Sequence, residues 1–166
     1  MTVPLRSTGQ GAQPEPEASV TLSALEWRTL AAVQSHLLPD EPGAPGAHAC
    51  RATHYLDRAI SEPGFDPAVR VFLLGGVAQL DGICREKHGK SFSDLEPERR
   101  EALLRALARV KPSGEDWLAT LLLYTLEASL GDPIYGGNPD GIGWRWLRHD
   151  PGTPRPRAAE RRELPR

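Results

Sequence analysis

The segment Asp132-Pro-Ile-Tyr-Gly-Gly-Asn-Pro-Asp-Gly-Ile-Gly-Trp144 decides how the chain can fold, because it holds four glycines and two prolines in thirteen positions. Proline lacks a backbone donor and glycine is costly to fix, so this segment suits neither a helix interior nor a central strand. Asn138 and Asp140 can form Asx turns, and the glycines permit positive φ. We therefore expect an ordered loop, which is either a binding site or a plug that closes a helical core.

A long apolar helix leads directly into this loop. It begins after the break Pro112-Ser-Gly114 and reaches about Leu130. A helix that is apolar on more than one face lies at the centre of a domain or is covered by a partner. The apolar side chains that place this helix in that class are Trp117, Leu118, Leu121, Leu122, Leu123 and Leu126.

Four further helices are expected before it, each with an apolar face at helical spacing. Ser23 and Glu26 form a capping-box pattern at the start of the first, and Asp66 with Pro67 opens the third, which Gly89 ends. Asp57 lies off the apolar face of the second. The expected ranges are about 23–38, 48–61, 67–88 and 97–111.

Gly75 and Gly76 lie in the middle of the third helix and cost it roughly 1 kcal/mol each relative to alanine. Close approach of another helix backbone is the compensation that we expect, and a kink is the alternative. The sequence as a whole predicts an all-α, compact bundle of about five helices over residues 21–150. Residues 1–20 are expected to be a flexible arm, and residues 151–166 a disordered basic tail.

The 166 residues suit one domain, and a net charge of −2 argues for neither nucleic acid nor an anionic membrane as a partner. The N-terminus has no apolar signal region. No apolar run approaches the roughly 20 residues that span a bilayer, so we expect no direct membrane span.

Cys50 and Cys84 are the only cysteines, too few for a disulfide framework, a four-cysteine metal site or an iron–sulfur cluster. Cys50 and His54 stand four residues apart without further ligands nearby, which argues against a metal site. Cys50 remains open as a buried thiol, a disulfide partner of Cys84 or a disulfide partner of another chain.

The sequence contains no calcium loop, P-loop, dinucleotide fingerprint or nucleophile elbow, and its five histidines are scattered. These observations favour a binding subunit over a catalyst. Two alternatives stay open: a stand-alone helical scaffold, and a small enzyme with a composite site around Asn138, Asp140 and His149.

Three stretches, in order, resemble the gluconate 2-dehydrogenase subunit 3 family, the small accessory subunits of flavin-dependent sugar and sugar-acid dehydrogenases. The first is Leu37-Leu38-Pro39-Asp40 with the loop Pro45-Gly46-Ala47, and the second is Tyr55-Leu56-Asp57. The third and most specific is Tyr135-Gly136-Gly137-Asn138 with Asp140 and Gly143-Trp144. The likeness covers roughly residues 21–150.

The resemblance implies a non-catalytic subunit that supports the folding, export or stability of a larger flavoprotein. FAD and sugar oxidation would then reside in that partner, and a cytochrome c subunit often completes such complexes. No cofactor is expected in this chain. The partner-binding residues would be Tyr135, Gly136, Gly137, Asn138, Asp140, Gly143 and Trp144.

Many relatives begin with a twin-arginine export signal, which this sequence does not show. The resemblance implies a periplasmic protein, whereas the missing signal leaves the cytoplasm open. The substrate would be a property of the partner and cannot be read from this chain.

Overall fold

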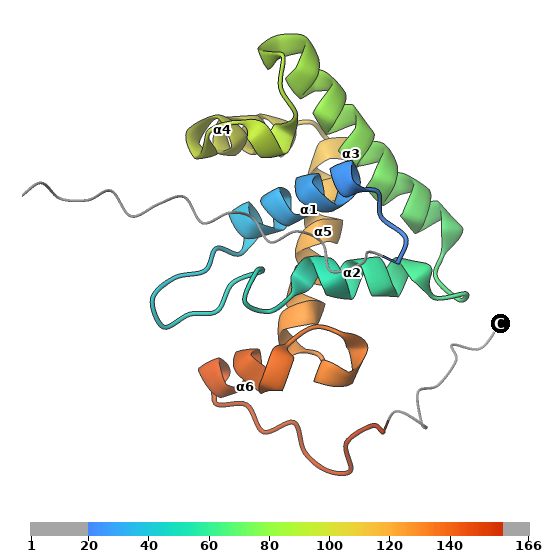
Figure 1. Cartoon of the computed structure of the whole chain (residues 1–166), viewed down its shortest axis with the longest axis vertical. Helices are drawn as coiled ribbons and strands as arrows, with labels where there is room; N and C mark the ends of the chain where they lie inside the picture. Colours follow the sequence, from blue (N-terminus) through green and yellow to red (C-terminus); the bar gives the residue numbers. More distant parts are fainter. Residues whose placement is uncertain (1–19, 158–166) are drawn as a thin grey trace, which may run out of the picture.

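The computed structural model describes residues 20–157, and within this range it contains six α-helices, three short 3-10 helices and no β-strand. The prediction of an all-α compact fold is confirmed (Figure 1). The α-helices are α1 (Ala24–Leu37), α2 (Ala52–Ser61), α3 (Pro67–His88), α4 (Pro97–Leu107), α5 (Ser113–Leu130) and α6 (Ile142–Leu147). The 3-10 helices are η1 (Phe92–Asp94), η2 (Pro133–Tyr135) and η3 (Pro139–Gly141).

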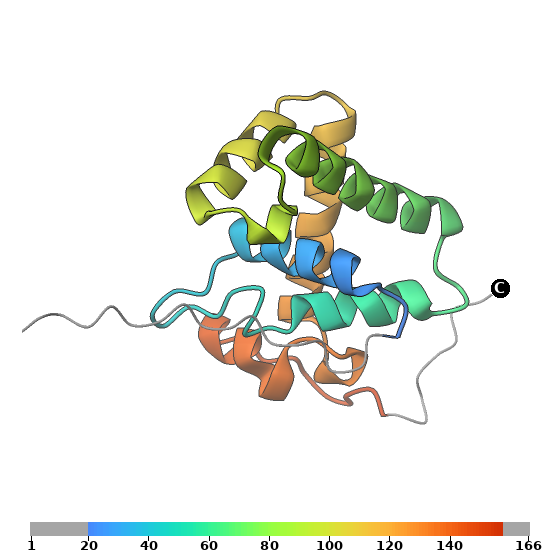
Figure 2. The same ribbon diagram turned by 45° about the horizontal axis from the view of Figure 1, so that its top comes forward.

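α5 runs through the middle of the molecule and packs against α1, α2, α3 and α6 (Figures 1 and 2). Its inner side chains, Trp117, Leu118 and Leu121, join a core that also receives residues from α1, α2, α3, α4 and η1. Its outer side remains apolar, because Leu123, Leu126 and Leu130 are all exposed. The prediction that α5 is a central helix is confirmed, while its cover by a partner stays a prediction for the exposed side.

The predicted helix ends are largely correct because they depend on local hydrogen bonding. Ser23 and Glu26 form the capping box of α1, in which the Glu26 carboxylate accepts the Ser23 N–H at 2.7 Å. Asp66 accepts the Ala68 N–H at 2.8 Å at the start of α3. Gly89 ends α3 with a φ of 67°, a conformation that glycine adopts without steric cost.

α2 begins at Ala52, four residues later than expected. The residues before it form turns, in which Asp40 accepts the backbone N–H groups of Gly46 at 2.7 Å and Ala49 at 3.2 Å. A Cβ on Gly46 would lie 2.3 Å from the Pro39 carbonyl carbon, so only glycine fits there. The apolar pattern could not reveal this, because it does not register side-chain bonds to the backbone.

Asp57 is buried at 3% exposure, so its expected position off the packed side of α2 is wrong. Its carboxylate accepts the N–H groups of Val20 (2.7 Å), Thr21 (3.0 Å) and Leu22 (2.9 Å). A carboxylate that accepts several backbone N–H groups is stabilised by bonds stronger than those between neutral groups. Asp57 thereby fixes the segment that leads into α1.

Gly76 is explained by a side chain and not by a helix backbone. A Cβ on Gly76 would lie 2.1 Å from Nε1 of Trp117, which donates to the Leu73 carbonyl at 3.0 Å. A Cβ on Gly75 would meet no atom within 4 Å. The indole of α5 therefore requires the second glycine of the pair, while nothing in the described chain requires the first.

α3 is long and apolar enough to cross a membrane, judged by length and composition alone, and 28% of the relevant stretch is buried. The expectation that no segment reaches this length is therefore wrong, because scattered polar side chains interrupt the apolar run without making the helix polar. Core helices pass the same test, and the buried side of α3 does pack in the core.

Both cysteines are buried and free, so the alternative of a Cys50–Cys84 disulfide is not realised. Burial raises the pKa of both thiols, that of Cys84 to about 11. Within residues 20–157, no group of three or more His, Cys, Asp and Glu side chains could hold a metal ion. Residues 1–19 of the predicted flexible arm (1–20) and residues 158–166 of the predicted disordered tail (151–166) lie outside the described part of the chain.

Candidate functional site

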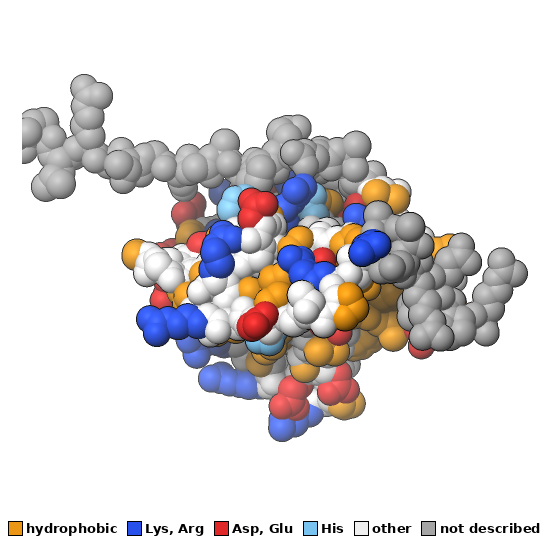
Figure 3. Space-filling view, turned by 90° about the horizontal axis from the view of Figure 1, so that it is seen from below, with side chains coloured by type: hydrophobic (Ala, Val, Ile, Leu, Met, Phe, Trp, Pro, Cys, Tyr) orange, Lys and Arg blue, Asp and Glu red, His pale blue; other side chains and the backbone are white. Residues whose placement is uncertain are grey.

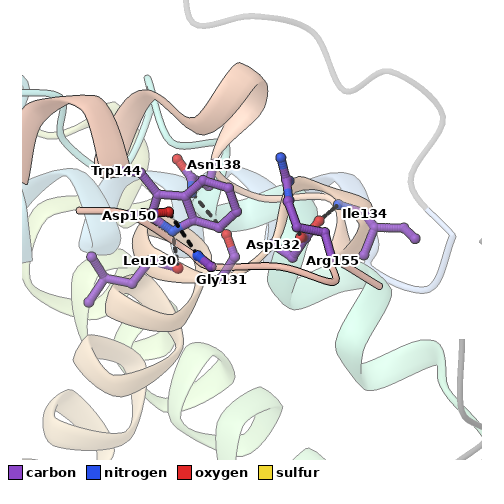
Figure 4. Close-up of polar contacts among 9 residues, drawn as sticks. Leu130, Gly131, Asp132, Ile134, Asn138, Trp144, Asp150 and Arg155 are labelled. Atoms are coloured by element: carbon purple, nitrogen blue, oxygen red, sulfur yellow. Dashed lines mark hydrogen bonds and ion pairs between the residues drawn. The ribbon is translucent and has the colours of Figure 1, made fainter. Parts of the chain in front are cut away.

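The glycine-rich loop starts at Asp132, which turns the chain away from α5. One carboxylate oxygen accepts the Ile134 N–H at 3.0 Å, and the other pairs with Nε of Arg155 at 3.0 Å (Figure 4). Burial acts to raise the pKa of Asp132, but the bonds from Arg155 and Ile134 outweigh it and lower the pKa. The carboxylate therefore stays ionised and connects the start of the loop to the chain beyond α6.

Asn138 holds the loop together and is fully buried. Its Nδ2 donates to the Gly131 carbonyl at 2.9 Å, and its Oδ1 accepts the Gly143 N–H at 2.8 Å. Its own backbone N–H donates to the Cys50 carbonyl at 2.9 Å. Its φ of 48° lies in the left-handed region that asparagine tolerates. One side chain thus joins the end of α5, the loop and the start of α6.

Two glycines let the loop lie directly on the last turns of α5. A Cβ on Gly137 would lie 2.4 Å from the Ala128 carbonyl oxygen, and one on Gly143 would lie 1.9 Å from that of Ser129. No side chain can occupy either position without moving the backbone. Close approach of the loop backbone is therefore used inside this chain, at the C-terminal end of α5.

Trp144 closes the loop against the same helix end. It is 7% exposed, and its Nε1 donates to the Leu130 carbonyl at 2.6 Å (Figure 4). The Arg155 guanidinium lies 4.7 Å from the centre of its ring, a cation–π contact. Trp144 and Asn138 together bind the carbonyls of Leu130 and Gly131. Carbonyls at a helix end have no intrahelical partner, so the loop serves as the C-terminal cap of α5.

The seven predicted partner-binding residues divide into two groups by exposure. Gly137, Asn138, Gly143 and Trp144 are buried in this chain. Tyr135, Gly136 and Asp140 reach the surface, with Tyr135 exposed at 41%. Only the second group is available for direct contact in this arrangement, while the first group fixes the position of the second.

The composite site around Asn138, Asp140 and His149 is not assembled as a cavity. The amide of Asn138 is engaged by Gly131 and Gly143, whereas Asp140 and His149 are exposed. His149 lies beside the ring of Trp144, 6.5 Å between centroids. Neither Asp140 nor His149 lines either of the two grooves described below.

Exposed apolar side chains lie along the second half of α5 and on α6. Leu123, Leu126 and Leu130 follow one another at intervals of three and four residues on α5, and Trp146 and Leu147 lie on α6. This spacing is that of the seam along which two helices pack. Figure 3 shows the molecule from the side of α6, where hydrophobic side chains lie among arginine and lysine side chains.

Two grooves cross the surface. One, of about 610 Å³, lies between α2 and the loop and is lined by charged, aromatic and proline side chains. The other, of about 450 Å³, lies between α3, α4 and the start of α5 and is lined mainly by apolar residues, among them Val71, Leu103 and Val110.

Polar residues buried between helices were not anticipated from the sequence. Gln34 of α1 accepts the Thr53 hydroxyl at 2.8 Å and donates to the Thr125 hydroxyl at 3.1 Å, which joins α1, α2 and α5. Tyr55 donates to Glu127 at 3.1 Å, and burial followed by that carboxylate raises the pKa of Tyr55. Tyr55 belongs to a stretch that resembles the family, so the sequence marked it as a candidate. Its partner Glu127 lies on α5, and the spacing of residues within α2 could not predict that contact.

The fold and the loop define a small all-α protein whose distinctive glycine-rich segment caps its central helix and leaves an apolar surface beside it. The model of one protein family, described as gluconate 2-dehydrogenase subunit 3, matches residues 24–152. The chain belongs to this family, as the three resembling stretches predicted. Comparison with curated proteins and with solved structures gives no match.

Proposed function

We propose that this chain is a non-catalytic accessory subunit that binds a larger FAD-dependent sugar or sugar-acid dehydrogenase and supports its folding, export or stability. The observation that carries the proposal is the family match over residues 24–152, since the family is named as a subunit of a dehydrogenase. A cytochrome c subunit would complete the complex.

The bonding of the loop supports a role without a cofactor in this chain. A nucleotide phosphate is held in a glycine-rich loop by backbone N–H groups that point at it. Here the N–H groups of Gly136, Gly141 and Gly143 donate to acceptors within the loop. The Asn138 N–H donates to the Cys50 carbonyl, which precedes α2. Four backbone donors of the loop are therefore already used inside this chain, which favours a structural role for its glycines over a phosphate site.

The exposed side of α5 supports a contact with that subunit. Leu123, Leu126 and Leu130 present an apolar stripe at helix-packing spacing, and Tyr135 adds an exposed aromatic side chain close to the same helix end. Aromatic residues and an apolar centre are typical of stable interfaces. We assign the partner contact to this stripe and to the exposed part of the loop.

The test is purification of the tagged chain from its native cells, followed by a visible absorption spectrum. We expect a larger protein and a flavin spectrum to co-elute with the wild-type chain. Leu126→Asp should lose most of the flavin absorbance without a large change in melting temperature, because Leu126 is 40% exposed.

Val110→Asp is the matched control. Val110 is also an exposed apolar residue (50%), but it lies away from the α5 stripe, in the groove between α3, α4 and the start of α5. Equal retention of flavoprotein by wild type, Leu126→Asp and Val110→Asp would reject α5 as the contact surface. A wild-type chain that elutes alone and colourless under conditions where the flavoprotein is present would reject the accessory role and favour the stand-alone scaffold.

A further inference from the structure

The groove between α3, α4 and the start of α5 has the size and lining of a small-molecule site. Its walls are mainly apolar, with Val71, Leu103 and Val110 among them, and Gln79 and Ser113 are its uncharged polar residues. Its volume is about 450 Å³, within the range of about 300–1,000 Å³ that such sites have. Ligand sites combine apolar walls with a few polar groups that orient the ligand, and this groove has both.

Close contacts fix the base of the groove. The indole of Trp117 fills the place of a Cβ on Gly76, and its Nε1 donates to the Leu73 carbonyl at 3.0 Å. A Cβ on Gly114 would lie 2.2 Å from the Leu107 carbonyl oxygen. α3 and α4 are thus each held directly against α5, so the groove between them is already formed in this chain.

The middle of the groove is left open at Gly75. This glycine lines the groove, and a Cβ on it would meet no atom within 4 Å. Glycine is less favourable than alanine inside a helix, and no contact in residues 20–157 requires it here. Its missing side chain leaves space for a ligand to lie directly along the backbone of α3.

The groove is long and narrow. Its lining follows α3 from Val71 to Lys87, which is about 24 Å of helix. A volume of about 450 Å³ over this length leaves a mean cross-section of about 20 Å². A helix with a diameter of about 10 Å would need about 80 Å². A hydrocarbon chain whose neighbours lie about 4 Å away needs about 16 Å², so one extended chain fits the groove.

Lys87 gives one end of the groove a positive charge. It is the only charged residue among the described residues that line the groove. It belongs to none of the ion pairs found within residues 20–157. An ammonium group at the end of an apolar groove favours a ligand that carries an anionic group at the end of its chain.

We propose that this groove binds a free, single-chain aliphatic carboxylate, that is, a fatty acid. Its hydrocarbon chain lies along α3 over Gly75, and its carboxylate lies beside Lys87. The groove is separate from the apolar stripe of α5 and from the glycine-rich loop. The proposal therefore does not depend on the accessory role.

The first test is calorimetric titration of the full chain with octanoate, decanoate and dodecanoate, each below its micelle-forming concentration. Affinity should rise about two- to fourfold with each added methylene, because each one leaves water for an apolar wall. Lys87→Gln should weaken dodecanoate binding about two- to fivefold, the effect of an exposed charge pair. Lys90→Gln, at an exposed lysine outside the groove, is the control and should bind like wild type. No binding of dodecanoate, or equal affinities for the three acids, would overturn the proposal.

The second test fills the groove. Leucine favours a helix over glycine, so Gly75→Leu should not lower the melting temperature, whereas its affinity for dodecanoate should fall at least tenfold. Gly82→Leu is the matched control, because Gly82 also lies on α3 and meets no atom within 4 Å but does not line the groove. It should bind dodecanoate like wild type. Equal affinities of the two variants would overturn the assignment of the acid to this groove.

The same variants separate a fatty acid from other occupants. Vesicles of anionic phospholipid that bind to Gly82→Leu but not to Gly75→Leu, without any binding of dodecanoate, would overturn the proposal in favour of a membrane surface. Loss of flavoprotein capture by Gly75→Leu alone, again without dodecanoate binding, would overturn it in favour of the larger subunit. Neither result would contradict the accessory role, so the two proposals fail separately.

Discussion

At the scale of single residues, the distinctive positions of this chain are polar side chains that bind backbone groups far away in the sequence. Asp40 closes the loop before α2, Asp57 fixes the entry to α1, and Asn138 fixes the cap of α5. All three belong to the stretches that resemble the family. Each one holds a loop that hydrophobic packing alone would leave undetermined.

Replacing Asn138 tests this role. Asn138→Ala would leave the Gly131 carbonyl and the Gly143 N–H without a partner in a buried place. We expect a loss of about 2–4 kcal/mol in the free energy of unfolding, measured by urea denaturation. Asp140→Gly, two residues on, is the control: Asp140 is exposed with a φ of 54°, so the change should stay within about 0.5 kcal/mol. Equal effects of both variants would contradict the assigned role.

At the scale of helices, the sequence predicted the helix ends that depend on neighbouring residues. It did not predict features that depend on a tertiary contact. The capping box of α1, the proline starts of α3 and α4 and the glycine end of α3 were all predicted from neighbouring residues. α6 was not, because its six residues follow a glycine-rich loop and carry too little periodicity to stand out. Its position is set by Trp144 on the end of α5, a contact that no local pattern contains.

The burial of Asp57 shows the same division. An apolar pattern assigns charged residues to the outside, and it therefore misplaced a carboxylate whose partners are three backbone N–H groups of a distant segment. The candidate site could be located from composition, since glycine, proline and asparagine mark an ordered loop. Composition could not predict which residues of the loop face inward, because that depends on how the loop packs on the end of α5.

The two adjacent glycines of α3 give a prediction at this scale. Gly76→Ala should destabilise the chain by about 1–3 kcal/mol, because the new Cβ would overlap the ring of Trp117. Gly75→Ala should stabilise it by about 0.5–1 kcal/mol, since alanine favours a helix and meets no atom there. Thermal unfolding of the two variants measures both. A Gly75→Ala variant that is more stable but captures less flavoprotein would extend the partner contact to α3, whereas destabilisation by both would contradict the open space at Gly75.

At the scale of the whole molecule, α5 is both the core and the element beside the proposed interface. Its inner side chains hold α1, α2 and α3 together, its outer leucines are uncovered, and its C-terminal end carries the loop. A subunit built in this way couples its own stability to the surface that it presents, because loss of the cap frays the same helix that carries the apolar stripe. Stability and partner binding can therefore be confused in a single variant.

Two tryptophans, two positions apart, separate these effects. Trp144→Ala removes an indole that is 7% exposed, bonds to the Leu130 carbonyl and lies against the Arg155 guanidinium. The free energy of unfolding should therefore fall by about 3–5 kcal/mol, which lowers the melting temperature by roughly 6–20 °C. Trp146→Ala removes an indole that is 46% exposed and should leave the melting temperature nearly unchanged. If α6 belongs to the interface, the Trp146→Ala variant should capture less flavoprotein than the wild-type chain. Capture is measured well below the melting temperature of each variant, so that both variants are folded. Should Trp144→Ala melt like wild type yet lose its partner, the buried indole would be an interface anchor and the loop would not be the cap of α5.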